Sequence, residues 1–279
     1  MPDDEPAENI SGGDAGGGRP AAFDSADEPA THPEAVVGAL GDLYWQKAYG
    51  GQDAFECLVR TILSQNTSDK ASQPAHDALM ARYGPDGSEW IGDLAASLAN
   101  AAQDELAETI SGAGLYNMKS ERIVALAERV VEEYGDADGF DAFVREEDPA
   151  TVRETLLEMN GVGPKTADCV LLFAGGRDGV FPVDTHVHRI SRRMGLAPAD
   201  ADHEGVRTAL EEAVPPEKCG FGHTAMIQFG REYCTAREPA CLQGPEACPL
   251  YDLCDRVGID ELSGEAVDPA EALADGAED

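Results

Sequence analysis

A lysine and an aspartate nineteen residues apart, Lys165 and Asp184, are the side chains of this sequence best suited to covalent chemistry. Lys165 follows a glycine-rich turn and opens an apolar stretch, which predicts the first turn of a helix. The helix dipole and apolar neighbours would both lower the pKa of its amine. Such an amine is the nucleophile that Schiff-base chemistry needs. Most lysines are solvated surface groups, so Lys165 alone establishes no enzyme.

Asp184 stands in the segment PVDTHVHR, where it is predicted to cap a helix. A purely structural cap is one interpretation of this residue. In the other, its carboxylate accepts the proton of the attacking amine and stabilises the cation that develops at a sugar C1′. The second interpretation requires a lysine nearby, and Lys165 is the candidate.

The turn before Lys165 has the sequence NGVGP, residues 160–164. Its glycines allow positive φ and close approach of another molecule to the backbone. The amides of Gly161, Val162 and Gly163, with the N-terminus of the next helix, can hold one DNA phosphate. The pattern also occurs at ordinary helix–turn–helix corners. It therefore indicates DNA binding without proving it.

Seven cysteines occur, and four of them are clustered. Cys57, Cys169 and Cys219 are scattered, and the first two lie in apolar helical runs typical of a core. The clustered four have the spacing C-x6-C-x6-C-x5-C and are Cys234, Cys241, Cys248 and Cys254. Four thiolates in a compact loop can bind a [4Fe–4S] cluster or a zinc ion. The N-terminus lacks the regions of a signal peptide, which predicts a cytoplasmic protein and disfavours disulfides.

The net charge of −34 is extreme and is shared between the tails and the rest of the chain. Such a charge would ordinarily repel nucleic acid. It would also suit an acidic surface adapted to high salt. Only five of the twenty basic residues are lysine, which favours the second interpretation and predicts a halophilic archaeon as the source. In molar salt counterion release contributes little, so DNA binding would depend on backbone hydrogen bonds and shape.

The hydrophobic pattern predicts an all-α protein without repeats. No run of eighteen apolar residues occurs, so no membrane span is expected. Residues 1–33 and 257–279 are predicted to be disordered acidic tails, and 135–147 a polar loop. Helices are expected near 34–50, 54–63, 70–83, 88–100, 103–111, 119–134, 149–159, 165–173, 185–195, 203–215 and 222–233.

Together these segments resemble the endonuclease III family, the helix-hairpin-helix DNA glycosylases. The resemblance covers residues 34–256. It rests on ILSQNTSD (62–69), GLYNMK (114–119), GVGPKTAD (161–168), VDTH (183–186), GREYC (230–234) and the four clustered cysteines. It implies two all-α lobes and a C-terminal iron–sulfur loop. A six-helix barrel with the hairpin would span 47–178, and a cluster domain would combine 34–46 with 179–256.

The resemblance also implies roles for individual residues. Lys165 would attack C1′, displace the damaged base and form the imine needed for β-elimination, with Asp184 as the catalytic aspartate. Leu115 would wedge into the duplex, and Asn66 or its neighbour Gln65 would fill the gap left by the flipped base. Three further positions would line the base pocket or its rim: Ser64, Asp69 and His186.

The implied function is that of a bifunctional glycosylase and abasic-site lyase acting on oxidised pyrimidines in double-stranded DNA. It would be a monomer in the cytoplasm, near the nucleoid, working ahead of an AP endonuclease. The family's cysteine spacing is C-x6-C-x2-C-x5-C, whereas the middle gap here has six residues, so zinc stays an alternative to [4Fe–4S]. The sequence is also compatible with a monofunctional mismatch (thymine or uracil opposite guanine) or adenine glycosylase, with a non-enzymatic hairpin protein, and with an iron–sulfur sensor.

Overall fold

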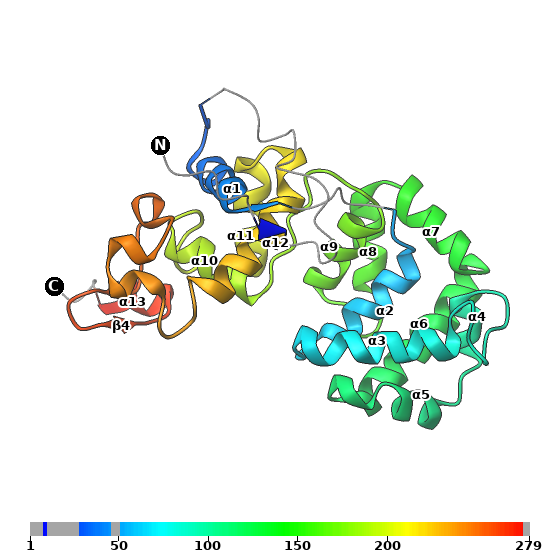
Figure 1. Ribbon diagram of the computed structural model, residues 1–279. Coiled ribbons are helices and arrows are strands. Elements are labelled where there is room, and N and C mark those ends of the chain that lie inside the picture. The colour runs from blue at the N-terminus through cyan, green and yellow to red at the C-terminus, as the bar shows by residue number, and fades with distance from the viewer. Residues whose placement is uncertain (1–7, 10–27, 46–50, 276–279) are drawn as a thin grey trace. The chain divides into compact units, whose positions relative to one another are not determined.

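Figure 1 shows the computed structural model, which describes residues 8–9, 28–45 and 51–275. Nearly all regular structure in these ranges is helical, which confirms the all-α prediction. The chain divides into two compact units, Tyr49–Arg177 and Met1–Ala48 with Asp178–Asp279. The barrel and cluster lobes expected over 47–178 and over 34–46 with 179–256 stay a prediction. Among the described residues, none of the helices could serve as a membrane span.

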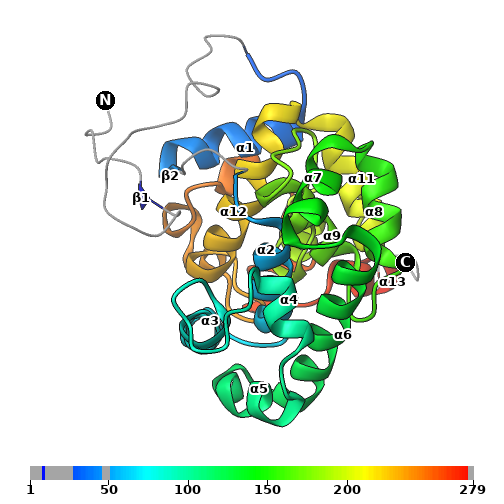
Figure 2. The same cartoon turned by 90° about the vertical axis from the view of Figure 1, so that its right-hand side faces the viewer.

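The Tyr49–Arg177 unit is packed around its first helix. The apolar stripe of that helix is fully buried, and the helix packs against α3, α4, α6, α7 and α9. The longest helix, α6, lies beside α4 and α5 (Figure 2). The elements are α2 (Ala54–Ser64), α3 (Asp69–Tyr83), α4 (Leu94–Ala99), α5 (Gln103–Thr109), η2 (Ser111–Ala113), α6 (Tyr116–Tyr134), α7 (Ala137–Glu146), α8 (Pro149–Leu157) and α9 (Pro164–Phe173).

Helix α7 corrects the prediction of a loop over residues 135–147. Asp136 caps this helix by accepting a hydrogen bond from the Gly139 amide at 2.8 Å. Phe140 and Val144, four residues apart, are fully buried on one face. The ring of Tyr134 lies 5.2 Å from that of Phe140 and in edge-to-face orientation. Acidic residues interrupt the short apolar stripe in the sequence, so the pattern alone did not predict a helix. Packing of the stripe within the fold stabilises the helix.

The other unit has α12 at its centre, in contact with α1 and α10. Its helices are α1 (His32–Leu43), α10 (Thr185–Arg193), α11 (His203–Ala213), α12 (Pro216–Glu232), η3 (Ala240–Gln243), η4 (Pro245–Ala247), η5 (Tyr251–Leu253) and α13 (Pro269–Asp275). Its strands are β1 (Glu8–Asn9) parallel to β2 (Tyr44–Trp45), and β3 (Ile259–Asp260) antiparallel to β4 (Glu265–Ala266).

The C-terminal segment corrects a second prediction, since residues 257–275 form β3, β4 and α13 and not a disordered tail. Arg192 makes a bidentate ion pair with Asp268, with N–O distances of 2.9 and 2.7 Å, which ties the segment to α10. Such a contact between distant residues is invisible to a composition argument. Most of the expected N-terminal tail, residues 1–7 and 10–27, lies outside the described residues, while 32 and 33 already belong to α1.

Candidate functional site

The glycine-rich turn lies between α8 and α9 as the sequence predicts. Gly161 has φ +83°, and a Cβ there would lie 2.6 Å from the Arg122 side chain, so only glycine fits. Gly163 is the N-cap of α9 and has no side chain with which to cap it. A Cβ on Gly163 would meet no protein atom within 4 Å. The first-turn amides of α9 are therefore approachable by an anion.

Lys165 is half-buried at the second position of α9, directly after Pro164. The helix is fixed to α8 by an ion pair between Asp168 Oδ1 and Arg153 Nε at 2.7 Å. The Asp168 side chain is 1% exposed. Burial raises the pKa of the Cys57 thiol to about 12, and the nearby positive charge of Lys165 acts against this shift. Lys165 thus stands on a rigid helix beside the hairpin.

The SQNTS loop between α2 and α3 separates the two candidates for the gap-filling residue. Gln65 Nε2 donates to the Gly161 carbonyl at 3.0 Å and to Thr166 Oγ1 at 3.2 Å. Its side chain therefore bridges the loop to the hairpin. Asn66 is exposed and has φ +51°, in the left-handed region that favours glycine. Asn66 is the one of the two whose side chain faces solvent.

Leu115 is 56% exposed and also has a left-handed backbone, with φ +49°. It stands immediately before α6, with Tyr116 and Met118 exposed beside it. Exposed apolar side chains next to a strained turn are suited to insertion between bases. Ser64 donates its hydroxyl proton to the Thr61 carbonyl at 2.8 Å and is partly buried. Asp69 begins α3, and its side chain lies outside the described residues.

Asp184 is the N-cap of α10, as predicted. Its Oδ1 accepts hydrogen bonds from the amides of His186 at 2.8 Å and Val187 at 2.9 Å. These bonds orient the carboxylate and leave Oδ2 without a hydrogen bond to any residue within the described ranges. The cap and the catalytic roles are therefore compatible in geometry. Asp184 and Lys165 belong to different units.

His186, predicted to border the base pocket, is packed against the GREYC segment. A Cβ on Gly230 would lie 2.5 Å from its Nδ1, which explains the glycine at that position. Burial lowers the pKa of His186, and Arg189 NH2 donates to Nδ1 at 3.2 Å. A neutral ring with a protonated Nε2 satisfies both observations. His188, by contrast, stacks on His203 with a 4.0 Å centroid separation.

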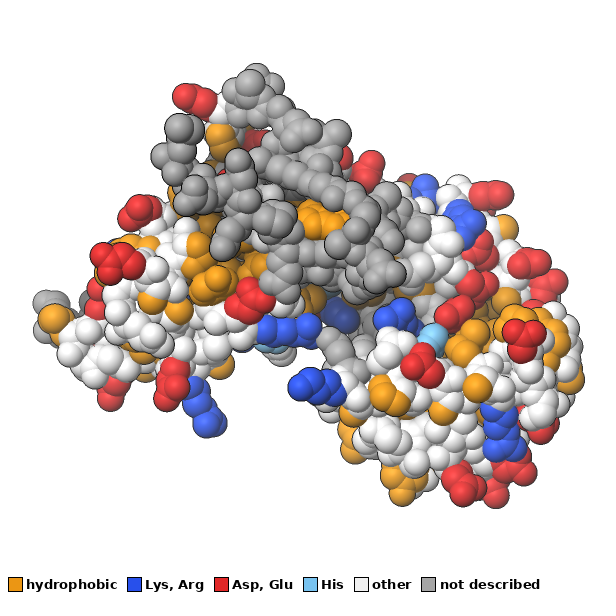
Figure 3. Space-filling model, viewed as in Figure 1, with side chains coloured by type: hydrophobic (Ala, Val, Ile, Leu, Met, Phe, Trp, Pro, Cys, Tyr) orange, Lys and Arg blue, Asp and Glu red, His pale blue; other side chains and the backbone are white. Residues whose placement is uncertain are grey.

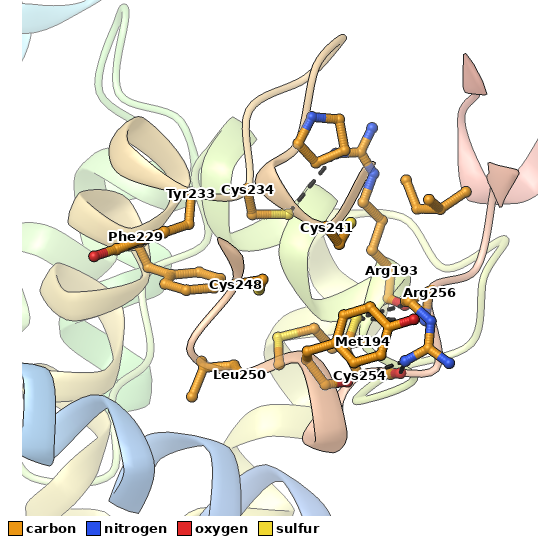
Figure 4. A pocket seen from close by; sticks show the side chains of 13 residues that line it. Arg193, Met194, Phe229, Tyr233, Cys234, Cys241, Cys248, Leu250, Cys254 and Arg256 are labelled. Atoms are coloured by element: carbon orange, nitrogen blue, oxygen red, sulfur yellow. Dashed lines mark hydrogen bonds between the residues drawn. The ribbon is translucent and has the colours of Figure 1, made fainter. Parts of the chain in front are cut away.

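The four clustered cysteines line one pocket with Arg193 and Arg256 (Figure 4). The volume of this pocket is about 380 Å³, part of which is open to solvent. Arg193 donates to Cys234 Sγ at 3.8 Å, and the Arg256 amide donates to Cys254 Sγ at 3.4 Å. Burial raises the pKa of the Cys241, Cys248 and Cys254 thiols, that of Cys254 to about 12. No three His, Cys, Asp or Glu side chains in the described ranges are arranged to hold a metal ion.

Lys119 is a residue whose importance the sequence interpretation missed. It is 0% exposed, although it is a lysine in the first turn of α6. Its Nζ contacts the loops that carry Asn66 and Leu115. A signal was present, because Lys119 stands four residues before Ile123 and seven before Leu126 on the apolar face of the helix.

The comparisons with known proteins agree with this geometry. Residues 59–216 match the HhH-GPD superfamily of base excision DNA repair proteins. The chain belongs to this superfamily. It is 34% identical to endonuclease III of Thermotoga maritima over 203 residues, which are 73% of this chain and 83% of the relative. A putative DNA repair glycosylase of Methanocaldococcus jannaschii is 28% identical over 213 residues, 75% of this chain and 89% of that protein.

Solved structures of similar proteins show the same fold. A trapped covalent intermediate of endonuclease III with DNA has TM-score 0.60 and 28% identity, covering 75% of this chain and 86% of that one. A thermostable thymine-DNA glycosylase has TM-score 0.63 at 21% identity, covering 81% and 96%, which shows the fold alone. The predicted endonuclease III resemblance is confirmed, and with it the coarser function of a base-excision repair DNA glycosylase.

Proposed function

We propose that this HhH-GPD protein is a bifunctional glycosylase and abasic-site lyase for oxidised pyrimidines in double-stranded DNA. The observation that carries the proposal is Lys165, which stands on α9 two residues after the open turn at Gly163. A phosphate bound at the first-turn amides of α9 would bring the DNA backbone to this lysine. The endonuclease III of the trapped structure forms a covalent intermediate with DNA, which an amine nucleophile accounts for.

The proposed chemistry uses two residues. Lys165 Nζ attacks C1′ as the bond from C1′ to the base breaks, and the base leaves with the bonding electrons. Asp184 stabilises the positive charge at the sugar through the Oδ2 that its capping bonds leave available. Loss of the amine proton opens the sugar ring and forms the imine at C1′. Removal of a C2′ proton then expels the 3′ phosphate, and water releases Lys165.

DNA binding by so acidic a protein needs an explanation other than a basic surface. Carboxylates are scattered over the face seen in Figure 3 rather than gathered in one patch. The chain has 54 acidic residues against 20 lysines and arginines. Backbone amides at Gly161–Gly163 bind a phosphate without a cationic side chain. We therefore expect affinity for abasic DNA to depend only weakly on salt concentration.

We also propose that Cys234, Cys241, Cys248 and Cys254 hold a [4Fe–4S] cluster. All four line one pocket, and N–H groups point at two of the sulfurs, which stabilises thiolates. A single zinc ion needs every sulfur about 2.3 Å from one centre. A [4Fe–4S] cluster binds each thiolate at a separate iron and therefore accepts sulfurs that lie farther apart. When bound, the group would link the loops of this segment and add binding free energy to folding.

The experiment for the catalytic proposal is borohydride trapping on a panel of lesion-containing duplexes in molar salt. Lys165→Ala should abolish the trapped adduct, and Asp184→Asn should slow base release while leaving abasic-site binding intact. Lys70→Ala, which removes an exposed lysine of the same unit, is the matched control and should trap normally. Trapping by Lys165→Ala would refute the assignment. The same panel separates oxidised pyrimidines from thymine or uracil mispaired with guanine, and metal analysis separates iron from zinc.

A further inference from the structure

We propose that Lys119 is a positioning residue that locks the Asn66 loop and the Leu115 turn into one base-flipping unit. This inference rests on the proposed function in one respect, namely that both loops enter DNA. It concerns residues of the Tyr49–Arg177 unit alone.

The ammonium group of Lys119 has three oxygen acceptors, one for each of its protons. Nζ donates to the Leu63 carbonyl at 2.7 Å, to Thr67 Oγ1 at 2.7 Å and to the Ala113 carbonyl at 2.8 Å. The residue is 0% exposed, so water does not share these bonds. Leu63 and Thr67 flank the Asn66 loop, and Ala113 belongs to the Leu115 turn. One cation therefore joins two segments that are far apart in sequence.

A direct hydrogen bond also links the Asn66 loop to the Leu115 turn. The Thr67 hydroxyl accepts from Lys119 and donates its own proton to the Ala113 carbonyl. The Ala113 oxygen thus receives hydrogen bonds from both Lys119 and Thr67. Burial disfavours the charged form and lowers the pKa of Lys119. The buried ammonium therefore relies on these oxygens for stabilisation, so the loops and the lysine depend on one another.

The strained residues of the unit lie at this junction. Asn66 and Leu115 have φ values of +51° and +49°, and among described non-glycine residues only Arg256, in the other unit, shares this sign. Such backbones persist when the surrounding contacts over-determine them. Asn66 directly precedes Thr67, and Leu115 lies two residues after Ala113. Lys119 thus fixes the backbone on the two turns that display the exposed Asn66 and Leu115 side chains.

The physical consequence is coupling. A shift of either turn would leave a proton of the buried ammonium without an acceptor, which is costly. The wedge at Leu115 and the filler at Asn66 should therefore act as one rigid unit. Loss of the lysine would free the two turns to move independently, while α9, which carries Lys165, keeps its ion pair with α8.

The test compares Lys119→Met, which keeps the length of the side chain, with Lys119→Arg and with Lys70→Met, an exposed lysine of α3 as the matched control. Base flipping is followed by 2-aminopurine fluorescence in a lesion duplex. Borohydride trapping is measured on the same duplex and on a single-stranded abasic oligonucleotide, which needs no flipping. Lys119→Met should lose the fluorescence change and about 100-fold of kcat on the duplex. Trapping on the single strand should stay close to that of the wild type, and Lys119→Arg should restore part of the duplex activity.

Two outcomes would overturn the inference: normal flipping by a folded Lys119→Met protein, or an equal loss on duplex and single strand, which indicates general damage. If Lys119→Met does not fold, Thr67→Val removes only the hydroxyl bridge and should give the same selective loss on a smaller scale. A combined Lys119→Met and Leu115→Ala variant should be no worse than the more impaired single variant if both act in one step. Absence of trapping by the wild type would refute the lyase proposal and leave the fluorescence test valid.

Discussion

Two buried cations, Lys119 and Arg193, organise loops in the two units, and they differ in how fully their N–H groups are hydrogen-bonded. Lys119 places every proton of its ammonium on an oxygen of its own unit. Arg193 is 3% exposed and donates to the carbonyls of Thr235 and Ala236 at 2.6 Å each, and to Cys234 Sγ at 3.8 Å. Its Nε has no hydrogen-bond partner within the described residues.

The comparison shows which loops are ordered by contacts within the protein alone. Around Lys119 the chain supplies all acceptors, so the loops need no ligand to be ordered. Around Arg193 one of the three acceptors is the Cys234 sulfur, which accepts only weakly when it is protonated. Burial raises the pKa of the other three pocket thiols, those of Cys241, Cys248 and Cys254. A metal centre that converts the thiols to thiolates would complete this site. We therefore expect the two units to respond differently to the same perturbation.

The largest expected effect is that of removing the proposed cluster. Cys248→Ala or iron chelation should expose the amides of residues 234–256 to hydrogen exchange, because several kcal/mol of metal-linked folding free energy would be lost. The amides of α2, α6 and α9 should stay protected. Cys57→Ala, a buried cysteine of the other unit, is the control and should leave the metal content unchanged. Equal loss of protection in both units would contradict the difference that we expect between them.

A smaller effect is expected at the buried ion pair of the Tyr49–Arg177 unit. Asp168→Asn removes the ion pair with Arg153, whose side chain is 17% exposed, and should lower the free energy of unfolding by about 3 kcal/mol. Urea unfolding measures this change. Glu133→Gln breaks a more exposed pair with Arg129 at 2.9 Å and should cost less than about 0.5 kcal/mol. Similar costs for the two variants would show that α8 and α9 do not depend on the buried pair.

The smallest effect concerns the C-terminal segment and is tested by pH. The hydrogen bonds from Arg192 lower the pKa of Asp268 below its ordinary value. The pair therefore stabilises the fold above the unfolded pKa of about 3.9, and this contribution is lost as pH falls through the lower folded pKa. Because the Asp268 side chain is 45% exposed, Asp268→Asn should cost at most about 1 kcal/mol at pH 7. Thermal melts of variant and wild type should converge at acidic pH, and a constant difference would contradict this origin.

The features that could be predicted from the sequence are those that depend on local interactions. Gly161 and Gly163 require a turn, Pro164 opens a helix, and Asp184 caps the next one, because each depends on the residue and its immediate neighbours. The family followed from several such motifs together, and Lys165 was placed on its helix correctly. The catalytic roles proposed for Lys165 and Asp184 remain predictions.

The features that depend on distant partners became visible in the folded chain and not in the sequence. The first acceptor of Lys119 is 56 residues away, and Gln65 finds the hairpin 96 residues away. No local pattern reveals such acceptors, so the role of Lys119 was missed and Gln65 was not distinguished from Asn66. Helix α7 and the C-terminal hairpin were missed for the same reason. Their stability comes from burial and ion pairing across the fold, which residue spacing alone does not encode.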